Sequence, residues 1–90
     1  MKTFKDLEFT PHPDPTIIGQ RAMMHFDDDY SVSVVITEES RANQLCPWSM
    51  AVLYKSEVTS HVLTTHDGYD VVHGLTANAV TVLMEKVQAL

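Results

Sequence analysis

The stretch that most constrains the fold is Tyr30–Thr37, which reads Tyr-Ser-Val-Ser-Val-Val-Ile-Thr and contains no glycine, proline or charged residue. Every second side chain from Tyr30 to Ile36 is large and apolar, and these side chains fall on one side of an extended chain. This alternation predicts a central β-strand with one fully buried face. Polar and acidic residues at 27–29 and 38–40 predict a turn at each end of it.

Other segments repeat the same period and extend the predicted sheet. Residues 20–26 alternate so that Ala22, Met24 and Phe26 face inward, and a short acidic connection joins them to the central strand as a β-hairpin. Trp48–Tyr54 alternates again. A shorter strand is predicted at 61–65, and residues 69–73 are predicted to form another short strand or a loop, ended by Gly74.

The end of the chain changes to a helical period. Thr76 is the predicted N-cap of a helix that runs to about residue 89. Apolar residues recur at spacings of three and four and form one stripe that must lie on the sheet: Val80, Leu83, Met84, Val87 and Leu90. The predicted fold class is α+β, an antiparallel sheet of four or five strands with one C-terminal helix packed on one face.

Residues 1–18 are predicted to form an extended N-terminal arm or edge strand followed by a proline-rich connector. Phe4, Leu7 and Phe9 alternate with charged residues, as on an edge strand. Three prolines between 11 and 15 are predicted to break this segment, because proline has no N–H to give to a sheet ladder. Residues 1–90 therefore form a single domain, with residues 76–90 as its helix.

Composition narrows the class of protein. Ninety residues with 44% apolar and 20% charged side chains indicate one soluble globular domain. The net charge of −6 argues against a nucleic acid or an anionic membrane as the main partner. A single cysteine, Cys46, excludes an internal disulfide. The absence of a signal peptide and of a long apolar run predicts a cytoplasmic location.

No chemical motif emerges from the residue types. His61, His66, Asp67 and His73 lie close in sequence, but their spacing matches no zinc or non-haem iron motif, and a histidine-based metal site remains the weaker alternative. Residues 27–29 lack the offsets of a calcium-binding loop. No nucleophile elbow or phosphate-binding glycine loop is present. We therefore predict no catalytic residues, no metal and no cofactor.

A binding surface is the remaining candidate. One helix can cover only one face of a single sheet, and the opposite face is predicted to hold Met23, Val35 and Leu53. Apolar groups there suggest a homodimer or a partner surface, unless the N-terminal arm covers them or they are scattered surface residues. A long polar loop is also predicted at 38–47, and long loops in small domains often carry function. With this loop and the acidic turn at 27–29 included, the candidate partner-binding residues are Met23, Val35, Leu53, Trp48, Asp27, Asp28, Asp29, Glu38, Glu39 and Arg41.

Several segments together resemble a group of small phage and prophage proteins of about this length, which have no assigned activity. The similar segments are residues 5–9 with the following Pro11-His12-Pro13, residues 26–35, residues 51–53 and residues 74–90. The resemblance implies a shared fold and a phage context, with the host-cell cytoplasm as the place of action. It implies no catalytic residues.

These observations lead to three hypotheses from different classes. The first is a phage accessory protein that binds a host or host-defence protein and inhibits it, as anti-CRISPR proteins do. The alternative is an oligomer that binds a nucleotide or signal molecule and so counters host defence, using Arg21, Arg41, a histidine or Trp48. The third is a metal-binding protein that uses His61, His66 and His73.

Overall fold

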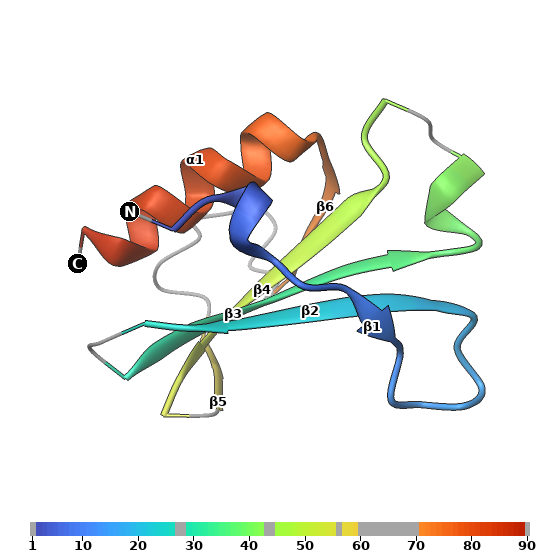
Figure 1. Ribbon diagram of the computed structural model, residues 1–90, viewed down its shortest axis with the longest axis horizontal. Coiled ribbons are helices and arrows are strands. Elements are labelled where there is room, and N and C mark those ends of the chain that lie inside the picture. The colour runs from blue at the N-terminus through green and yellow to red at the C-terminus, as the bar shows by residue number, and fades with distance from the viewer. Residues whose placement is uncertain (1, 27–28, 43–44, 56, 60–70, 90) are drawn as a thin grey trace.

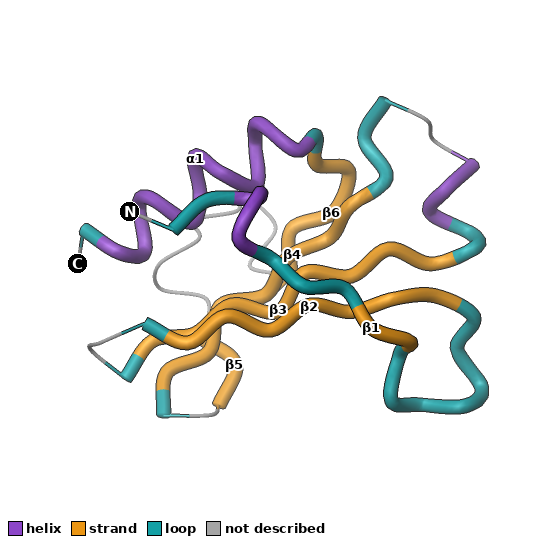
Figure 2. The backbone as a smooth tube through the Cα atoms, viewed as in Figure 1, coloured by secondary structure: helices purple, strands orange, loops and turns teal. Residues whose placement is uncertain are grey.

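The computed structural model describes residues 2–26, 29–42, 45–55, 57–59 and 71–89, with the backbone alone for 57–59. Its elements follow one another along the chain as η1 (Phe4–Asp6), β1 (Thr10–Pro11), β2 (Gly19–His25), β3 (Tyr30–Thr37), η2 (Ser40–Ala42), β4 (Trp48–Tyr54), β5 (Glu57–Thr59), β6 (Val71–Leu75) and α1 (Ala77–Gln88). All described strand pairs are antiparallel, and α1 lies on one side of the sheet (Figures 1 and 2). The predicted α+β class is confirmed.

The sheet is built around β3, which pairs with β2 on one side and β4 on the other. The bounds predicted for β3 and β4 agree with the structure, because both strands show a clear period of two between turn residues. Asp29 adopts a left-handed conformation (φ 66°) at the β2–β3 turn. Its carbonyl accepts a hydrogen bond from the Lys55 N–H at 3.0 Å, which places the end of β4 beside this turn.

β5 and β6 share one edge of β4. β5 pairs with the last residues of β4, and β6 pairs with residues 48–51. The prediction that Gly74 ends the preceding strand is wrong, because Gly74 lies inside β6 with a φ of 69°. This left-handed residue sits opposite the register shift between Trp48 and Met50. The strand predicted at 61–65 lies outside the described residues.

The core lies between α1 and the sheet. Its fully buried side chains come from alternate positions of β3 and β4 and from the inward stripe of α1: Val32, Val34, Met50, Val52, Val80, Met84 and Val87. The Thr76 hydroxyl accepts a hydrogen bond from the Ala79 N–H at 3.0 Å, so the predicted N-cap is confirmed. A helix of twelve residues is only marginally stable by itself, so α1 is stabilised mainly by the burial of its apolar stripe against the sheet.

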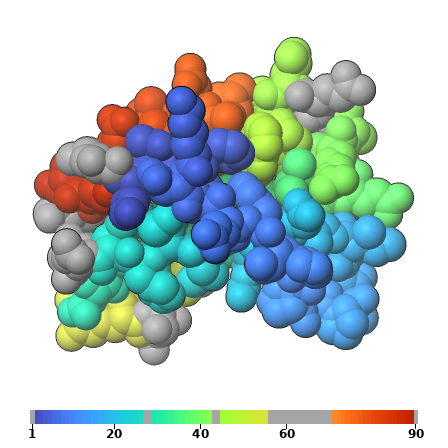
Figure 3. Space-filling view, in the orientation of Figure 1, coloured from blue at the N-terminus to red at the C-terminus, as the bar shows by residue number. Residues whose placement is uncertain are grey.

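The N-terminal segment folds against the helix, and its first part is neither an extended arm nor an edge strand. It starts with a 3₁₀ turn, in which Asp6 accepts a hydrogen bond from the Thr3 N–H. The Phe4 N–H donates to Thr81 Oγ1 at 3.1 Å, and Lys2 exchanges two backbone hydrogen bonds with the Gln88 side chain. The space-filling view shows this segment lying across the helix and the strands (Figure 3).

Pro11 contradicts the prediction that the prolines stay out of the sheet. It belongs to β1, where it lies opposite Gln20. Proline is accepted there because β1 is an edge strand, whose outer backbone groups need no partner strand. The connector after it is held by Asp14, whose carboxylate accepts hydrogen bonds from the Thr16 hydroxyl at 2.7 Å and the Thr16 N–H at 2.9 Å. These bonds lower the pKa of Asp14 below its ordinary value.

Candidate functional site: the sheet face opposite the helix

The sheet face opposite α1 collects the odd-numbered side chains of β2, β3 and β4. The register places Met23 beside Ser33, Val35 beside Ser49, and Leu53 beside Ser31. On the last strand, Val71 lies opposite Ala51. Among the described residues, α1 and η1 both lie on the other side of the sheet (Figure 1). We call this surface the groove face.

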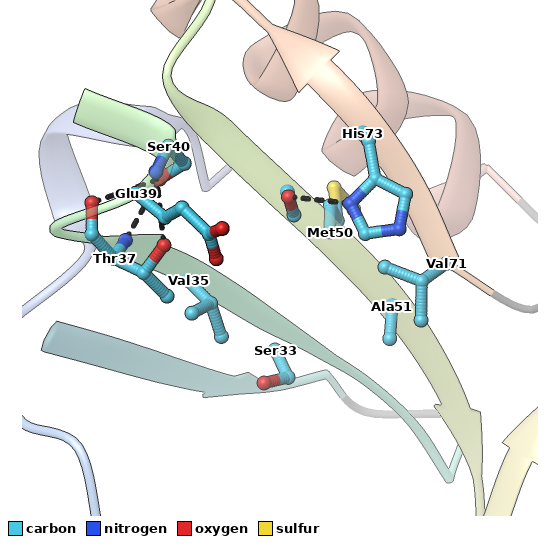
Figure 4. Close-up of a pocket in the computed structure, with 10 residues that line it drawn as sticks. Ser33, Val35, Thr37, Glu39, Ser40, Met50, Ala51, Val71 and His73 are labelled. Carbon is cyan, nitrogen blue, oxygen red and sulfur yellow. Dashed lines mark hydrogen bonds between the residues drawn. The ribbon is translucent and has the colours of Figure 1, made fainter. Parts of the chain in front are cut away.

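An open groove of about 560 Å³ runs across the groove face. Its lining comes from β3, β4, β6 and the turn after β3: Ser33, Val35, Thr37, Glu39, Ser40, Ser49, Met50, Ala51, Val71 and His73 (Figure 4). Apolar side chains occupy its middle, and hydroxyl groups, a carboxylate and an imidazole stand around them. Such a mixture is typical of binding sites, in which apolar groups supply contact area and a few polar groups supply orientation.

One end of the groove is built by the turn from Thr37 to Ser40. The Thr37 N–H donates to Ser40 Oγ at 2.8 Å, and the Ser40 N–H donates to Thr37 Oγ1 at 3.0 Å. Ser40 Oγ donates in turn to the Thr37 carbonyl at 3.1 Å. These reciprocal bonds hold the backbone around Glu39, whose side chain extends over Val35 (Figure 4). No basic side chain of the described residues forms an ion pair with Glu39.

The other end of the groove carries the pair Ser49 and His73. Ser49 Oγ and His73 Nδ1 lie 2.9 Å apart, within hydrogen-bond distance. In a catalytic triad the serine contacts Nε2 of the histidine and a carboxylate contacts Nδ1, whereas here Ser49 faces Nδ1. No carboxylate of the described residues hydrogen-bonds to His73. In the described part of the chain, this pair therefore offers a polar contact to a ligand and lacks the acid member of a triad.

The predicted partner-binding residues do not form one surface in the structure. Met23, Val35 and Leu53 lie on the groove face and are half-buried, as predicted for that face. The acids Glu38 and Glu39 lie at the far end of β3, with Glu39 in the groove and Glu38 outside it. Asp29 lies at the opposite end of β3, exposed in the β2–β3 turn.

Trp48 and Arg41 do not join the groove. Trp48 lies on the helix side of the sheet, where its ring meets Phe4 edge-on at a centroid distance of 4.9 Å. Arg41 lies in η2 and is exposed. Both line a separate hollow on that side. Asp27 and Asp28 lie outside the described residues.

Sequence reasoning missed Ser49, Val71 and Ser40 as groove residues. Val71 and His73 line the groove because β6 pairs with β4. No local sequence pattern predicts which strand β6 pairs with. The Thr37–Ser40 turn is different, because hydroxyl residues spaced three apart around a chain reversal are a recognisable signal of side-chain-to-backbone bonding.

The described residues hold no group of three or more His, Cys, Asp or Glu side chains that could bind a metal ion. Of the histidine group proposed for metal binding, only His73 belongs to that part of the chain, and its Nδ1 faces Ser49. His61, His66 and Asp67 lie outside it. No helix in the described ranges has both the length and the apolar character needed to cross a membrane.

Comparison with protein-family models, with curated proteins and with solved structures found no match to this chain.

Proposed function

We propose that this protein acts by binding another protein through its groove face. The observation that carries the proposal is the gathering of half-buried apolar side chains from three strands around one open groove, with no described helix above them. Apolar surface of this kind is favourable to bury, and on small proteins it commonly marks an interaction site. In the phage context suggested by the sequence, the bound protein is a host or host-defence protein, and binding inhibits it.

The charges indicate what kind of segment the groove accepts. Glu39 extends into the groove without a basic partner among the described residues, and the whole chain carries a net charge of −6. A partner segment with a lysine or arginine next to small aliphatic side chains would bring a positive charge to Glu39 and apolar groups to Val35 and Ala51. Complementary charge of this sort raises the association rate and favours one partner over others.

The test uses two charge insertions at valines on opposite sides of the molecule. Val35→Arg places a cation in the groove, whereas Val82→Arg places the same cation on the outward face of α1, where Val82 is 63% exposed. Wild-type protein and both variants are used to capture partners from host lysate, and the captured protein is then purified and titrated against each of them.

We expect a stoichiometric complex with the wild type and with Val82→Arg, and a loss of at least tenfold in affinity with Val35→Arg. Equal binding by the two variants would refute the assignment to the groove face. Native mass measurements will also detect a complex formed only between copies of this chain. If such a complex forms and is lost in Val35→Arg, the groove face is a homodimer interface and does not bind a foreign protein.

One observation favours the alternative hypothesis that the protein binds a nucleotide. Two of its predicted residues, Arg41 and Trp48, line the same hollow, although Arg21 belongs to the other face of the sheet. This hollow is separate from the groove.

A further inference from the structure

The helix covers only part of its side of the sheet, and aromatic side chains line an open hollow beside it. Phe4 and Phe9 come from the N-terminal segment, and Trp48 is the first residue of β4. Their rings lie close together, with centroid distances of 5.9 Å between Phe4 and Phe9 and 4.9 Å between Phe4 and Trp48. All three are half-buried, so each ring still presents surface to the hollow, whose volume is about 390 Å³.

Backbone hydrogen bonds to α1 hold one aromatic wall of the hollow. The Phe4 N–H donates to Thr81 Oγ1, and the Lys2 backbone is tied to the Gln88 side chain, so α1 fixes the position of the N-terminal segment. On the other wall, buried Pro47 precedes Trp48 and restricts the backbone that leads into β4. A site whose walls are set before a ligand arrives loses little conformational entropy on binding.

The mouth of the hollow is polar and carries one positive charge. Gln20 and Arg41 line it, both exposed, from β2 and η2 respectively. No carboxylate of the described residues forms an ion pair with Arg41. The exposed guanidinium group can donate to an anionic group of a ligand, and the Gln20 amide offers both a donor and an acceptor.

The surrounding charges limit how much negative charge a ligand can bring. Glu38 lines an adjoining hollow that shares Gln20 and Arg41 with the aromatic one. Its carboxylate, together with the net charge of −6, opposes a polyphosphate chain extending past Arg41. A single anionic group at Arg41 brings less negative charge toward Glu38 than a polyphosphate chain does, and it is therefore opposed less.

We propose that this hollow binds a small planar aromatic molecule that carries one anionic group, a class that includes nucleoside monophosphates. The ring packs against Phe9 and Trp48, since aromatic groups prefer offset or edge-on contact with one another. The anionic group meets Arg41, and Gln20 hydrogen-bonds to the edge of the ring. This activity goes beyond the protein binding proposed for the groove face and uses the opposite side of the sheet.

The chain contains one tryptophan, so its fluorescence reports directly on this hollow. The protein is titrated with adenosine and guanosine 5′-monophosphates, with the two nucleosides and with inorganic phosphate. Free N-acetyltryptophanamide, titrated in parallel, corrects for absorption by the ligands. We expect a saturable change with at least one monophosphate, binding about tenfold weaker for its nucleoside, and no change with phosphate alone.

Two arginine substitutions test the position of the anionic group. Arg41→Gln is expected to lower the affinity for the monophosphate about tenfold, to that of the nucleoside. Arg21→Gln, which removes the same charge from the groove face, is expected to leave it unchanged. Phe9→Leu is expected to weaken the monophosphate and the nucleoside by the same factor, because it removes a ring contact common to both. Melting temperatures of all variants establish that they are folded.

Three results would overturn the proposal. The first is the absence of saturable binding by both monophosphates. The second is an equal effect of Arg41→Gln and Arg21→Gln. The third is tighter binding of the corresponding triphosphate, because this would contradict the restriction to a single anionic group.

Discussion

Two valines two positions apart in α1 provide a sharp test of how the helix lies on the sheet. Val80 is fully buried in the core, and Val82 is 63% exposed. Alanine at either position removes the same two methyl carbons and improves intrinsic helix propensity by about 0.5 kcal/mol. The two substitutions therefore differ only in the environment that the side chain leaves.

The magnitudes follow from burial. At about 0.8 kcal/mol for each buried carbon, Val80→Ala loses about 1.6 kcal/mol of transfer free energy. The cavity left between α1 and the sheet adds about 1 kcal/mol. After the gain in helix propensity, Val80→Ala should lower the free energy of unfolding by about 2 kcal/mol, whereas Val82→Ala should raise it by about 0.5 kcal/mol.

Thermal and urea unfolding, followed by circular dichroism, measure both values. For a domain of this size, the melting temperature should fall by about 8–16 °C for Val80→Ala and rise by about 2–4 °C for Val82→Ala. The urea m-value should stay constant, which shows that only stability has changed. Equal losses at both positions, or a larger loss at Val82, would refute the orientation of α1 on the sheet.

Substitutions at four other positions test local features of the fold. Gly19→Ala should cost about 2–3 kcal/mol, because the new Cβ would lie 2.3 Å from the Ile36 carbonyl oxygen and would force β2 away from β3. Gly74→Ala should lower the free energy of unfolding by only about 1 kcal/mol, because its φ of 69° is unfavourable for alanine but no atom lies within 4 Å of the new Cβ. A larger loss of stability for Gly74→Ala than for Gly19→Ala in urea unfolding would contradict this account. Thr76→Ala should cost about 1 kcal/mol through loss of the helix cap, whereas Thr76→Ser should retain most of the stability. Thr16→Ala should raise the pKa of Asp14 toward its ordinary value in an NMR titration, because the Thr16 hydroxyl is the main cause of the lowered pKa. Because the pKa of Asp14 is lowered in the folded state, its carboxylate stabilises the connector at pH values above the ordinary pKa of aspartate, and this contribution is lost as the pH falls through the folded-state pKa. An unchanged titration midpoint of Asp14 in Thr16→Ala would refute the role of the Thr16 hydroxyl.

Local patterns were sufficient for the elements that repeat one period over their whole length. The alternation in Tyr30–Thr37 and Trp48–Tyr54 predicted both strands with their bounds, because a strand exposes each successive side chain to the opposite face. The threonine at 76 and the apolar stripe after it predicted the helix and its cap for a similar reason. The face assigned to Met23, Val35 and Leu53 followed from the same alternation.

The binding sites depended on contacts between residues that are distant in the chain. The groove needs β6 beside β4, which brings His73 to Ser49 across 24 positions. The aromatic hollow needs the N-terminal segment to fold back on α1, so that Phe4 reaches Trp48 and Thr81. The alternation along Trp48–Tyr54 places Trp48 on the opposite side of the sheet from Leu53, but it carries no signal for the contact between Trp48 and Phe4.

The amino-acid sequence by itself determined which segments are strands and helix and which side of each is apolar, because backbone geometry converts residue spacing directly into faces. The tertiary structure alone decided which faces meet. The order of strands along β4 and the position of the N-terminal segment depend on the packing and hydrogen bonds of the assembled core, and these act between residues whose separation along the chain carries no periodic signal.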